Sequence, residues 1–272
     1  MQQVSRGREL SYGIIAHLGP HAAAVASRLG RKPALAIVTG ADEQSRRFVQ
    51  IKQRLLGGME IEIRPVWLEA DADTAQTLEI IERLNPRNDL EAIFLQFPLP
   101  EAIDASRVSN AIEADKDIDC SSAAAEARFM EGTTEFVPVA PQAACMLLRE
   151  TLGELPGRAI VVYGDDDPFV RGLRILLRRE SAHVDGTIGD AEALVVSEPL
   201  PPADMLSNAS ALSVVLDAGY YLPPRTTEWL PPGIADRTGV LLKQYGNVGP
   251  LTVANLARAT VRAASRRVNL ET

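Results

Sequence analysis

Short apolar runs alternate with amphipathic stretches along the first half of the chain. Apolar runs of strand length fall at 34–39, 61–68 and 92–96, and amphipathic stretches of helical periodicity fall at 45–56 and 74–84. An apolar run of five to eight residues followed by a helical pattern is typical of a β-α unit. Because consecutive β-α units place their strands side by side and parallel, the pattern predicts a mostly parallel sheet.

The alternation begins again after Pro138. Helical periodicity is predicted at 141–152 and 171–179, strands at 159–163, 193–196 and 213–217, and a long final helix at 251–267. A strand that runs into Gly164 and then a helix is the opening of a Rossmann-like unit. The fold class is therefore α/β, with two α/β lobes around a cleft and a C-terminal helix that returns to the first lobe. The predicted lobes are 1–137 together with 251–272, and 138–250.

Composition and charge narrow the class of protein. The 272 residues carry a net charge of −8, with 46% hydrophobic and 24% charged residues, which is ordinary for a soluble globular protein. The net negative charge argues against nucleic acid, whose binding requires clustered cations. The two cysteines, Cys120 and Cys145, imply no disulfide framework. We find no apolar leader or membrane-spanning run, so we expect a cytoplasmic protein with no membrane partner.

Four short stretches stand out because of their order along the chain. They are Gly40–Lys52 (GADEQSRRFVQIK), Gln96–Pro100 (QFPLP), Lys116–Cys120 (KDIDC) and Gly246–Thr252 (GNVGPLT). Each is too short to be specific alone. Together they resemble the patterns VG-x4-S-x2-YV-x2-K, QLPLP, KDVDG and GGVGPMT of the bifunctional methylenetetrahydrofolate dehydrogenase/methenyltetrahydrofolate cyclohydrolase family.

The resemblance implies catalytic roles for three residues. Lys52 matches the family's principal catalytic lysine, Gln96 the glutamine that assists it, and Asp119 the aspartate that binds the pterin ring. The chemistry is consistent, because a lysine removed from water can exchange protons near neutral pH and a neighbouring amide can hold it in place. The structural alternative is a solvated lysine on a helix, with Gln96 and Asp119 acting only as caps of a strand and a turn.

The same resemblance implies further contacts with the folate. These residues lie in the four stretches named above: Phe48, Pro98, Leu99, Gly249, Pro250 and Thr252. Phe48 replaces the family's tyrosine, so stacking on a flat substrate could remain while the hydrogen bond of the phenol is lost. At Gly249-Pro250 a turn before the final helix is expected to let the backbone approach the ligand. Cys120 stands where the family has glycine.

The predicted nucleotide loop departs most from the family. The family reads GRS after its Rossmann strand, with Arg and Ser holding the 2′-phosphate of NADP, whereas this chain reads Gly164-Asp165-Asp166 and continues with Asp167. Carboxylates at a helix N-terminus occupy the place where a phosphate would bind and repel it. Gly164 is therefore a degenerate cofactor-binding position, and the loop argues against NADP. NAD stays open, because Asp185 lies about where an acid could accept from a ribose hydroxyl.

No metal site is predicted. His17 and His21 are four residues apart, but Gly19-Pro20 lies between them and is expected to break the helical face that a zinc pair needs. His183 has no histidine close to it in the sequence.

The sequence thus predicts a tetrahydrofolate enzyme without nicotinamide redox. It would hydrolyse 5,10-methenyltetrahydrofolate, or transfer the one-carbon unit of 5,10-methylenetetrahydrofolate to a nucleophilic acceptor. One alternative is a full NAD(P)-dependent dehydrogenase/cyclohydrolase, and another is a non-catalytic folate-binding paralogue. The resemblance also implies a homodimer.

Overall fold

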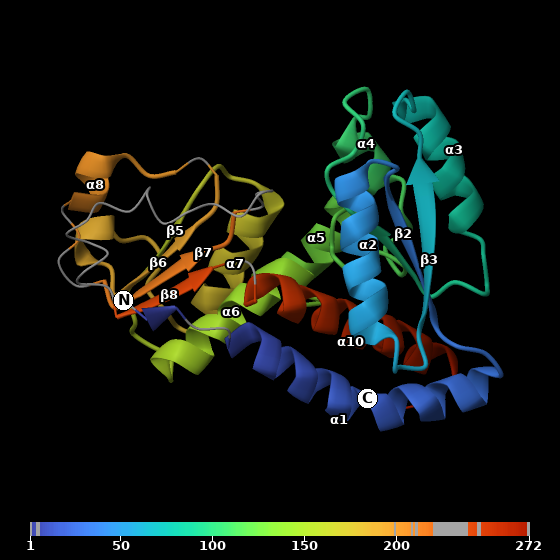
Figure 1. Cartoon of the computed structure of the whole chain (residues 1–272), viewed down its shortest axis with the longest axis horizontal. Coiled ribbons are helices and arrows are strands. Elements are labelled where there is room, and N and C mark those ends of the chain that lie inside the picture. The colour runs from blue at the N-terminus through green and yellow to red at the C-terminus, as the bar shows by residue number, and fades with distance from the viewer. Residues whose placement is uncertain are drawn as a thin grey trace. The chain divides into compact units, whose positions relative to one another are not determined.

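The computed structural model describes residues 2–3, 6–198, 200–207, 209, 212–219, 239–243 and 246–270. The chain divides into two compact units. Unit 1 contains Met1–Ser11 and Val139–Thr252, and unit 2 contains Tyr12–Pro138 and Val253–Thr272. Each unit has a parallel sheet with helices packed on it (Figure 1), which confirms the predicted α/β class.

Unit 2 is built around a three-stranded sheet. Its order is β3-β2-β4, so β2 is central and pairs in parallel with both neighbours. All the strands and helices predicted for this half of the chain are present, and the short helices α4 and α5 are additional. The elements are β2 (Ala34–Gly40), α2 (Glu43–Leu56), β3 (Glu62–Leu68), α3 (Thr74–Leu84), β4 (Ala92–Leu95), α4 (Ala105–Asn110) and α5 (Ala123–Glu131).

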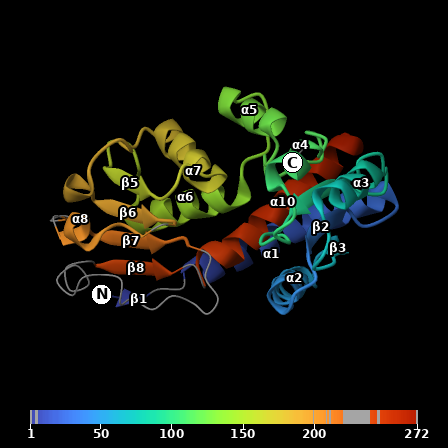
Figure 2. The same cartoon turned by 90° about the horizontal axis from the view of Figure 1, so that it is seen from above.

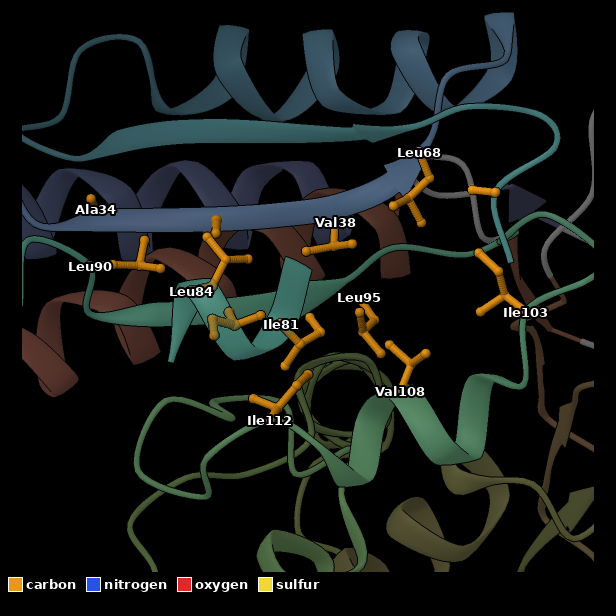
Figure 3. Packing of buried hydrophobic residues seen from close by; sticks show 13 residues of the cluster. Ala34, Val38, Leu68, Ile81, Leu84, Leu90, Leu95, Ile103, Val108 and Ile112 are labelled. Carbon is orange, nitrogen blue, oxygen red and sulfur yellow. The ribbon is translucent and has the colours of Figure 1, made fainter. Parts of the chain in front are cut away.

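Both faces of this sheet are buried, which explains why its central strand is buried along its whole length and apolar from Ala34 to Val38. Successive side chains of β2 point to opposite faces, so Ala34, Ala36 and Val38 share one face, where they pack with residues of α3 and α4 (Figure 3). A second cluster, formed by α1 (Arg6–Leu29), the end of α2 and α10 (Val248–Arg267), packs with Ile61 and Ile63. The helical periodicity in the sequence therefore corresponds to helices with a buried face.

Two long helices differ from the expectation. Helix α1 was not predicted, and it continues through Gly19-Pro20, which was wrongly expected to break it. Proline removes one backbone hydrogen bond, and burial of Ala22 and Val25, both 0% exposed, offsets that loss. Helix α10 begins three residues before the predicted start. Gly249 and Pro250 therefore lie in its first turn instead of in a preceding turn, where a proline costs no intrahelical bond.

Unit 1 contains a five-stranded parallel sheet of order β1-β8-β7-β6-β5, whose strands follow one another across Figure 2. Helix α6 contacts α7 and β7, and α7 contacts β5. No helix among the described residues combines the length and apolarity needed to cross a membrane. The elements are β1 (Gln2–Gln3), α6 (Val139–Leu152), β5 (Ile160–Tyr163), α7 (Pro168–Arg179), the 3-10 turn η1 (Ile188–Asp190), β6 (Ala193–Val196), α8 (Ala203–Ser207), β7 (Val214–Asp217) and β8 (Val240–Lys243).

A buried carboxylate joins the amino-terminal end of the unit 2 sheet to α10. The Glu91 side chain is 0% exposed. It accepts hydrogen bonds from both terminal nitrogens of Arg31, at 2.9 and 2.6 Å, and from Arg267 at 2.9 Å. The backbone N–H of Ala34 donates to it at 2.7 Å. Burial by itself raises the pKa of Glu91, but these hydrogen bonds and charges outweigh burial, so the pKa lies below its usual value.

We expect Glu91→Ala to lower the free energy of unfolding by about 2–3 kcal/mol, since it removes the partner of two arginines and of a buried N–H. The Glu91 pKa is depressed in the folded state, so its contribution is full above the unfolded pKa and is lost as pH falls through the folded pKa. The difference between variant and wild type should therefore shrink below about pH 4. Urea denaturation monitored by circular dichroism measures both effects. Glu62→Ala, at a half-exposed ion pair, is the control, and an equal loss there would contradict the assignment.

Candidate active site

The carboxyl end of the unit 2 sheet carries a buried lysine. Lys52 lies on α2 and is only 6% exposed. Its Nζ donates to Gln96 Oε1 at 2.6 Å, and Gln96 follows directly on β4. Burial lowers the pKa of Lys52 to about 8. The structure thus brings together the two residues that the sequence pairs as catalytic, in a setting where the amine can gain or lose a proton near neutral pH.

Two aromatic rings flank this ammonium group. The Lys52 Nζ lies 5.9 Å from the centroid of the Phe48 ring and 5.8 Å from that of Phe94. Phe48 precedes Lys52 by one helical turn, and Phe94 lies on β4 two residues before Gln96. The rings exclude water and offer their faces to the cation. Phe94 was not predicted as a site residue, although its period-two relation to Gln96 places both side chains on the same face of the sheet.

Gln96 is itself held by two groups that sequence analysis missed. Its Nε2 donates to Thr39 Oγ1 at 3.1 Å and to the backbone oxygen of Ser45 at 3.2 Å. Thr39 lies near the end of β2, and Ser45 lies in the first turn of α2. The available signal was the parallel β2-β4 pairing, which brings the carboxyl ends of the two strands to one edge of the sheet.

The N-terminus of α2 is fixed by a local cap. Asp42 accepts from the backbone N–H of Ser45 at 2.9 Å and from the Ser45 hydroxyl at 2.6 Å. Burial alone would raise the pKa of Asp42, but these two hydrogen bonds outweigh burial and lower it. Because the cap determines where α2 begins, it also determines where Lys52 stands on the helix.

Asp119 lies in a turn just after a parallel bridge between Asp117 and Ile93 of β4. Asp117 is fully buried and accepts from the backbone N–H groups of Ser121 and Ser122 at 3.0 and 2.7 Å. Asp119 follows this bridge by two residues and is partly exposed. Its role in binding a pterin stays a prediction.

Cys120, which stands where the resembled pattern has glycine, adopts φ +52°. A side chain in this left-handed region costs about 1 kcal/mol. Burial raises the pKa of the Cys120 thiol well above its usual value, so the thiol is neutral. We infer that Cys120 fills space in the loop and is not a nucleophile.

The other predicted folate contacts are divided between the two units. In unit 2, Pro98 follows a cis peptide bond after Phe97 and is exposed, while Leu99 is partly buried against the cluster of Figure 3. In unit 1, Gly249, Pro250 and Thr252 lie in the first turns of α10, where the Thr252 hydroxyl donates to the Val248 carbonyl at 2.9 Å. Their contact with a folate stays a prediction.

The predicted nucleotide loop follows β5 in unit 1. Gly164 lies against the end of β6, where a Cβ on Gly164 would come within 2.9 Å of Ser197 Cβ. Asp167 caps α7 by accepting from the Val170 N–H at 2.8 Å, and Pro168 begins the helix. This cap explains why α7 starts three residues before the predicted helix. The capping carboxylate occupies the helix N-terminus, where the sequence analysis placed it.

The remaining acids of this part of the chain are exposed. Asp165 and Asp166 lie at the surface, and Asp166 is 3.9 Å from Arg171 and 3.8 Å from Arg174. Asp185 forms an ion pair of 2.6 Å with Arg178. Among the described residues, no three or more His, Cys, Asp or Glu side chains are grouped so as to hold a metal ion.

Comparison with known proteins places this geometry in context. Residues 6–119 match the family model "Tetrahydrofolate dehydrogenase/cyclohydrolase, catalytic domain". The chain is 31% identical to the bifunctional protein FolD of Maricaulis maris (96% of this chain, 95% of that protein) and 30% identical to that of Methanoculleus marisnigri (88% and 89%). Its fold is similar to the Trypanosoma brucei N5,N10-methylenetetrahydrofolate dehydrogenase-cyclohydrolase solved with NADP and an inhibitor, with a TM-score of 0.81 at 23% identity over 96% of this chain and 97% of that one.

The close approach at Gly164 generates a test of the loop. We expect Gly164→Ala to lower the free energy of unfolding by about 2 kcal/mol, because the new methyl group meets Ser197 and the Glu198 carbonyl and the φ of +155° disfavours a side chain. Gly186→Ala is the matched control in the same unit, since a Cβ there meets nothing within 4 Å. Thermal denaturation of both variants measures the difference, and equal midpoints would show that the β5-β6 contact is loose.

Proposed function

Because the chain belongs to the tetrahydrofolate dehydrogenase/cyclohydrolase family, we propose that it transforms a 5,10-bridged tetrahydrofolate without nicotinamide redox. It is a folate one-carbon enzyme of this family, and the proposal concerns which reaction it performs. The two candidate reactions are hydrolysis of 5,10-methenyltetrahydrofolate and transfer of the one-carbon unit of 5,10-methylenetetrahydrofolate to an acceptor. Both need a group that moves protons beside the bridging carbon.

The observation that carries the proposal is the buried Lys52–Gln96 pair. In the hydrolysis, water adds to the bridging carbon of the methenyl group, the bond from that carbon to N5 breaks, and a formyl group remains on N10. Both protons of the attacking water must leave its oxygen: one reaches N5 and the other is released to solvent, because the methenyl substrate carries a positive charge that the formyl product lacks. The Lys52 amine, whose pKa is about 8, can accept a proton from the water and donate it to N5. The Gln96 Oε1 keeps the ammonium in place between these steps.

The transfer reaction would use the same residues. The methylene carbon forms one bond to a nucleophilic atom of the acceptor and one to the oxygen of a water molecule, while its bonds to N5 and N10 break, so that a hydroxymethyl group is transferred. The two folate nitrogens each gain a proton, one released by the acceptor and one by the water. Lys52 is again the proton carrier, and Asp119 would hold the pterin ring through its N–H groups. Phe48 lacks the phenol that the resembled pattern has beside the lysine, so a hydrogen bond in the pocket is lost, which favours an acceptor other than water.

The acids after β5 support the absence of nicotinamide redox. The Trypanosoma brucei relative was solved with NADP, and the resembled pattern has Arg and Ser where this chain has Asp165 and Asp166. Here Asp167 already satisfies the first turn of α7. A phosphate placed there would lose the helix N–H group and gain carboxylate neighbours, both of which weaken binding.

A NAD(P)-dependent dehydrogenase/cyclohydrolase is the competing function. An acid that accepts from a ribose hydroxyl would favour NAD over NADP. Asp185 is the acid at about the expected distance along the chain, but its carboxylate already forms an ion pair with Arg178. A folate-binding paralogue without turnover is the third candidate, and it requires a Lys52 that contributes nothing to the reaction.

We expect Lys52→Met to lower kcat for hydrolysis of 5,10-methenyltetrahydrofolate by about a hundredfold or more, because the proton carrier is lost. In the wild type the rate should rise with pH and level off above about pH 8, since the neutral amine accepts the proton from water and burial lowers the Lys52 pKa to about 8. The loss of methenyl absorbance, corrected for the uncatalysed reaction, measures both.

Lys32→Met is the matched control for this experiment, because the Lys32 side chain is 52% exposed and forms a surface ion pair with Glu60. Folate binding without turnover in the wild type, unchanged by Lys52→Met, would establish the non-catalytic paralogue. Turnover that survives Lys52→Met would rule out the assigned proton carrier.

Calorimetry separates the redox and non-redox functions. We expect heat from a stable folate analogue at micromolar concentration and none from NADP or NAD. Asp165→Arg combined with Asp166→Ser should create detectable NADP binding, because it replaces two repelling carboxylates by the residues of the resembled pattern. Tight binding of either nucleotide by the wild type would instead establish the dehydrogenase.

A further inference from the structure

Each polar atom of the Gln96 side chain has a buried hydrogen-bond partner. Gln96 is 2% exposed, Lys52 is 6% exposed, and Thr39 is 0% exposed. The Gln96 Oε1 accepts from Lys52 Nζ, while Nε2 donates one hydrogen to Thr39 Oγ1 and the other to the Ser45 carbonyl. Both hydrogens of the amide are therefore used on one side and its oxygen on the other.

The chemistry of these partners determines which way the amide faces. The Ser45 carbonyl only accepts, and a lysine ammonium only donates. If the amide were rotated by half a turn, Oε1 would face the carbonyl oxygen and Nε2 would face the ammonium, so both contacts would be repulsive. The Thr39 hydroxyl accepts from Nε2 in the unrotated orientation, so Thr39 and the Ser45 carbonyl together anchor the nitrogen of the amide.

We propose that Thr39 is a positioning residue: its hydroxyl accepts from Gln96 Nε2 and so keeps Gln96 Oε1 directed at Lys52. The inference rests on the proposed function, in which Lys52 carries the proton. Thr39 does not touch the reacting atoms and acts through Gln96.

The consequence for Lys52 follows from its surroundings. Burial is the cause of its lowered pKa, the neighbouring rings of Phe48 and Phe94 are uncharged, and Gln96 Oε1 is its hydrogen-bond acceptor in the described part of the chain. Without the Thr39 hydroxyl, the Gln96 Nε2 keeps the Ser45 carbonyl as its acceptor, and Gln96 Oε1 is directed at Lys52 for a smaller fraction of the time. The charged form of Lys52 is then less well stabilised, while the neutral form is little affected.

Two substitutions separate the hydroxyl from the shape of the side chain. Thr39→Val keeps the branched shape and removes the acceptor, whereas Thr39→Ser keeps the acceptor and removes a methyl group. Thr77→Val is the matched control, because Thr77 is also 0% exposed and its hydroxyl donates to the carbonyl of Asp73, the N-cap residue of α3, at 2.8 Å. Thermal midpoints of all three variants show whether each remains folded at the assay temperature.

The first measurement is turnover of 5,10-methenyltetrahydrofolate. For Thr39→Val we expect kcat to fall about three- to tenfold, the range for loss of one hydrogen bond, with KM within about twofold of the wild type. Thr39→Ser should recover most of the rate, and Thr77→Val should match the wild type. A purely structural role for Thr39 would instead change the thermal midpoint alone, or make the Ser variant as slow as the Val variant.

The second measurement is independent of turnover. The chain has four lysines, Lys32, Lys52, Lys116 and Lys243, so carbon-13 labelling of lysine gives few side-chain signals, and Lys52→Met assigns that of Lys52. We expect the Lys52 titration midpoint to fall by about half a pH unit in Thr39→Val and to stay unchanged in Thr39→Ser and Thr77→Val.

The two measurements separate a failure of the hydrolytic function from a failure of the positioning role of Thr39. A wild-type protein that hydrolyses no methenyltetrahydrofolate would overturn the hydrolytic function, and the Lys52 titration would still test Thr39. A Lys52 midpoint and a kcat that are the same in Thr39→Val and the wild type would overturn the positioning role.

Discussion

The carboxyl end of the unit 2 sheet is organised around a lysine ammonium that has been withdrawn from water. Removal of a cation from water is unfavourable. Here the ammonium is stabilised instead by one amide oxygen at 2.6 Å and by two aromatic ring faces. None of these carries a charge. The ammonium is therefore stabilised enough to remain buried but not enough to keep its ordinary pKa, which is the condition under which a lysine exchanges protons near neutral pH.

The amino-terminal end of the same sheet also contains a buried charged side chain, but there the charge is compensated by ion pairs. There Glu91 is buried as a full charge and surrounded by the guanidinium groups of Arg31 and Arg267. Those contacts join α10 and the segment after α1 to the start of β2 and β4. The two ends of the sheet therefore differ in function. Charge is fully compensated where the helices are attached, and it is left uncompensated where the site lies.

Unit 1 has a parallel sheet, and the turn after its strand β5 carries three consecutive acids, Asp165, Asp166 and Asp167. The Gly164 contact with β6 preserves the tight turn after β5, and Asp167 satisfies the helix that follows. Packing therefore fixes the shape of this turn, whereas its charge depends on a few side chains. Fold and cofactor preference are in general separable for the same reason.

The sequence by itself determined the α/β class, the predicted strands and the pairing of Lys52 with Gln96 as candidates. Periodicity and motif spacing are local properties, and burial on both faces leaves a clear apolar signal in β2. Helix α1 was missed because Pro20 is unfavourable locally and only the packing of Ala22 and Val25 compensates for it. The roles of Thr39, Phe94 and the Ser45 carbonyl could not be read from the sequence for a related reason. Phe94 lies more than 40 residues from Lys52, and Gln96 lies more than 50 residues from Thr39 and Ser45. The parallel register of β2 and β4, together with α2 after β2, brings these residues together. Only tertiary structure decides how deeply a side chain is buried, and burial converts Lys52 from an ordinary helix lysine into one whose proton is available for chemistry.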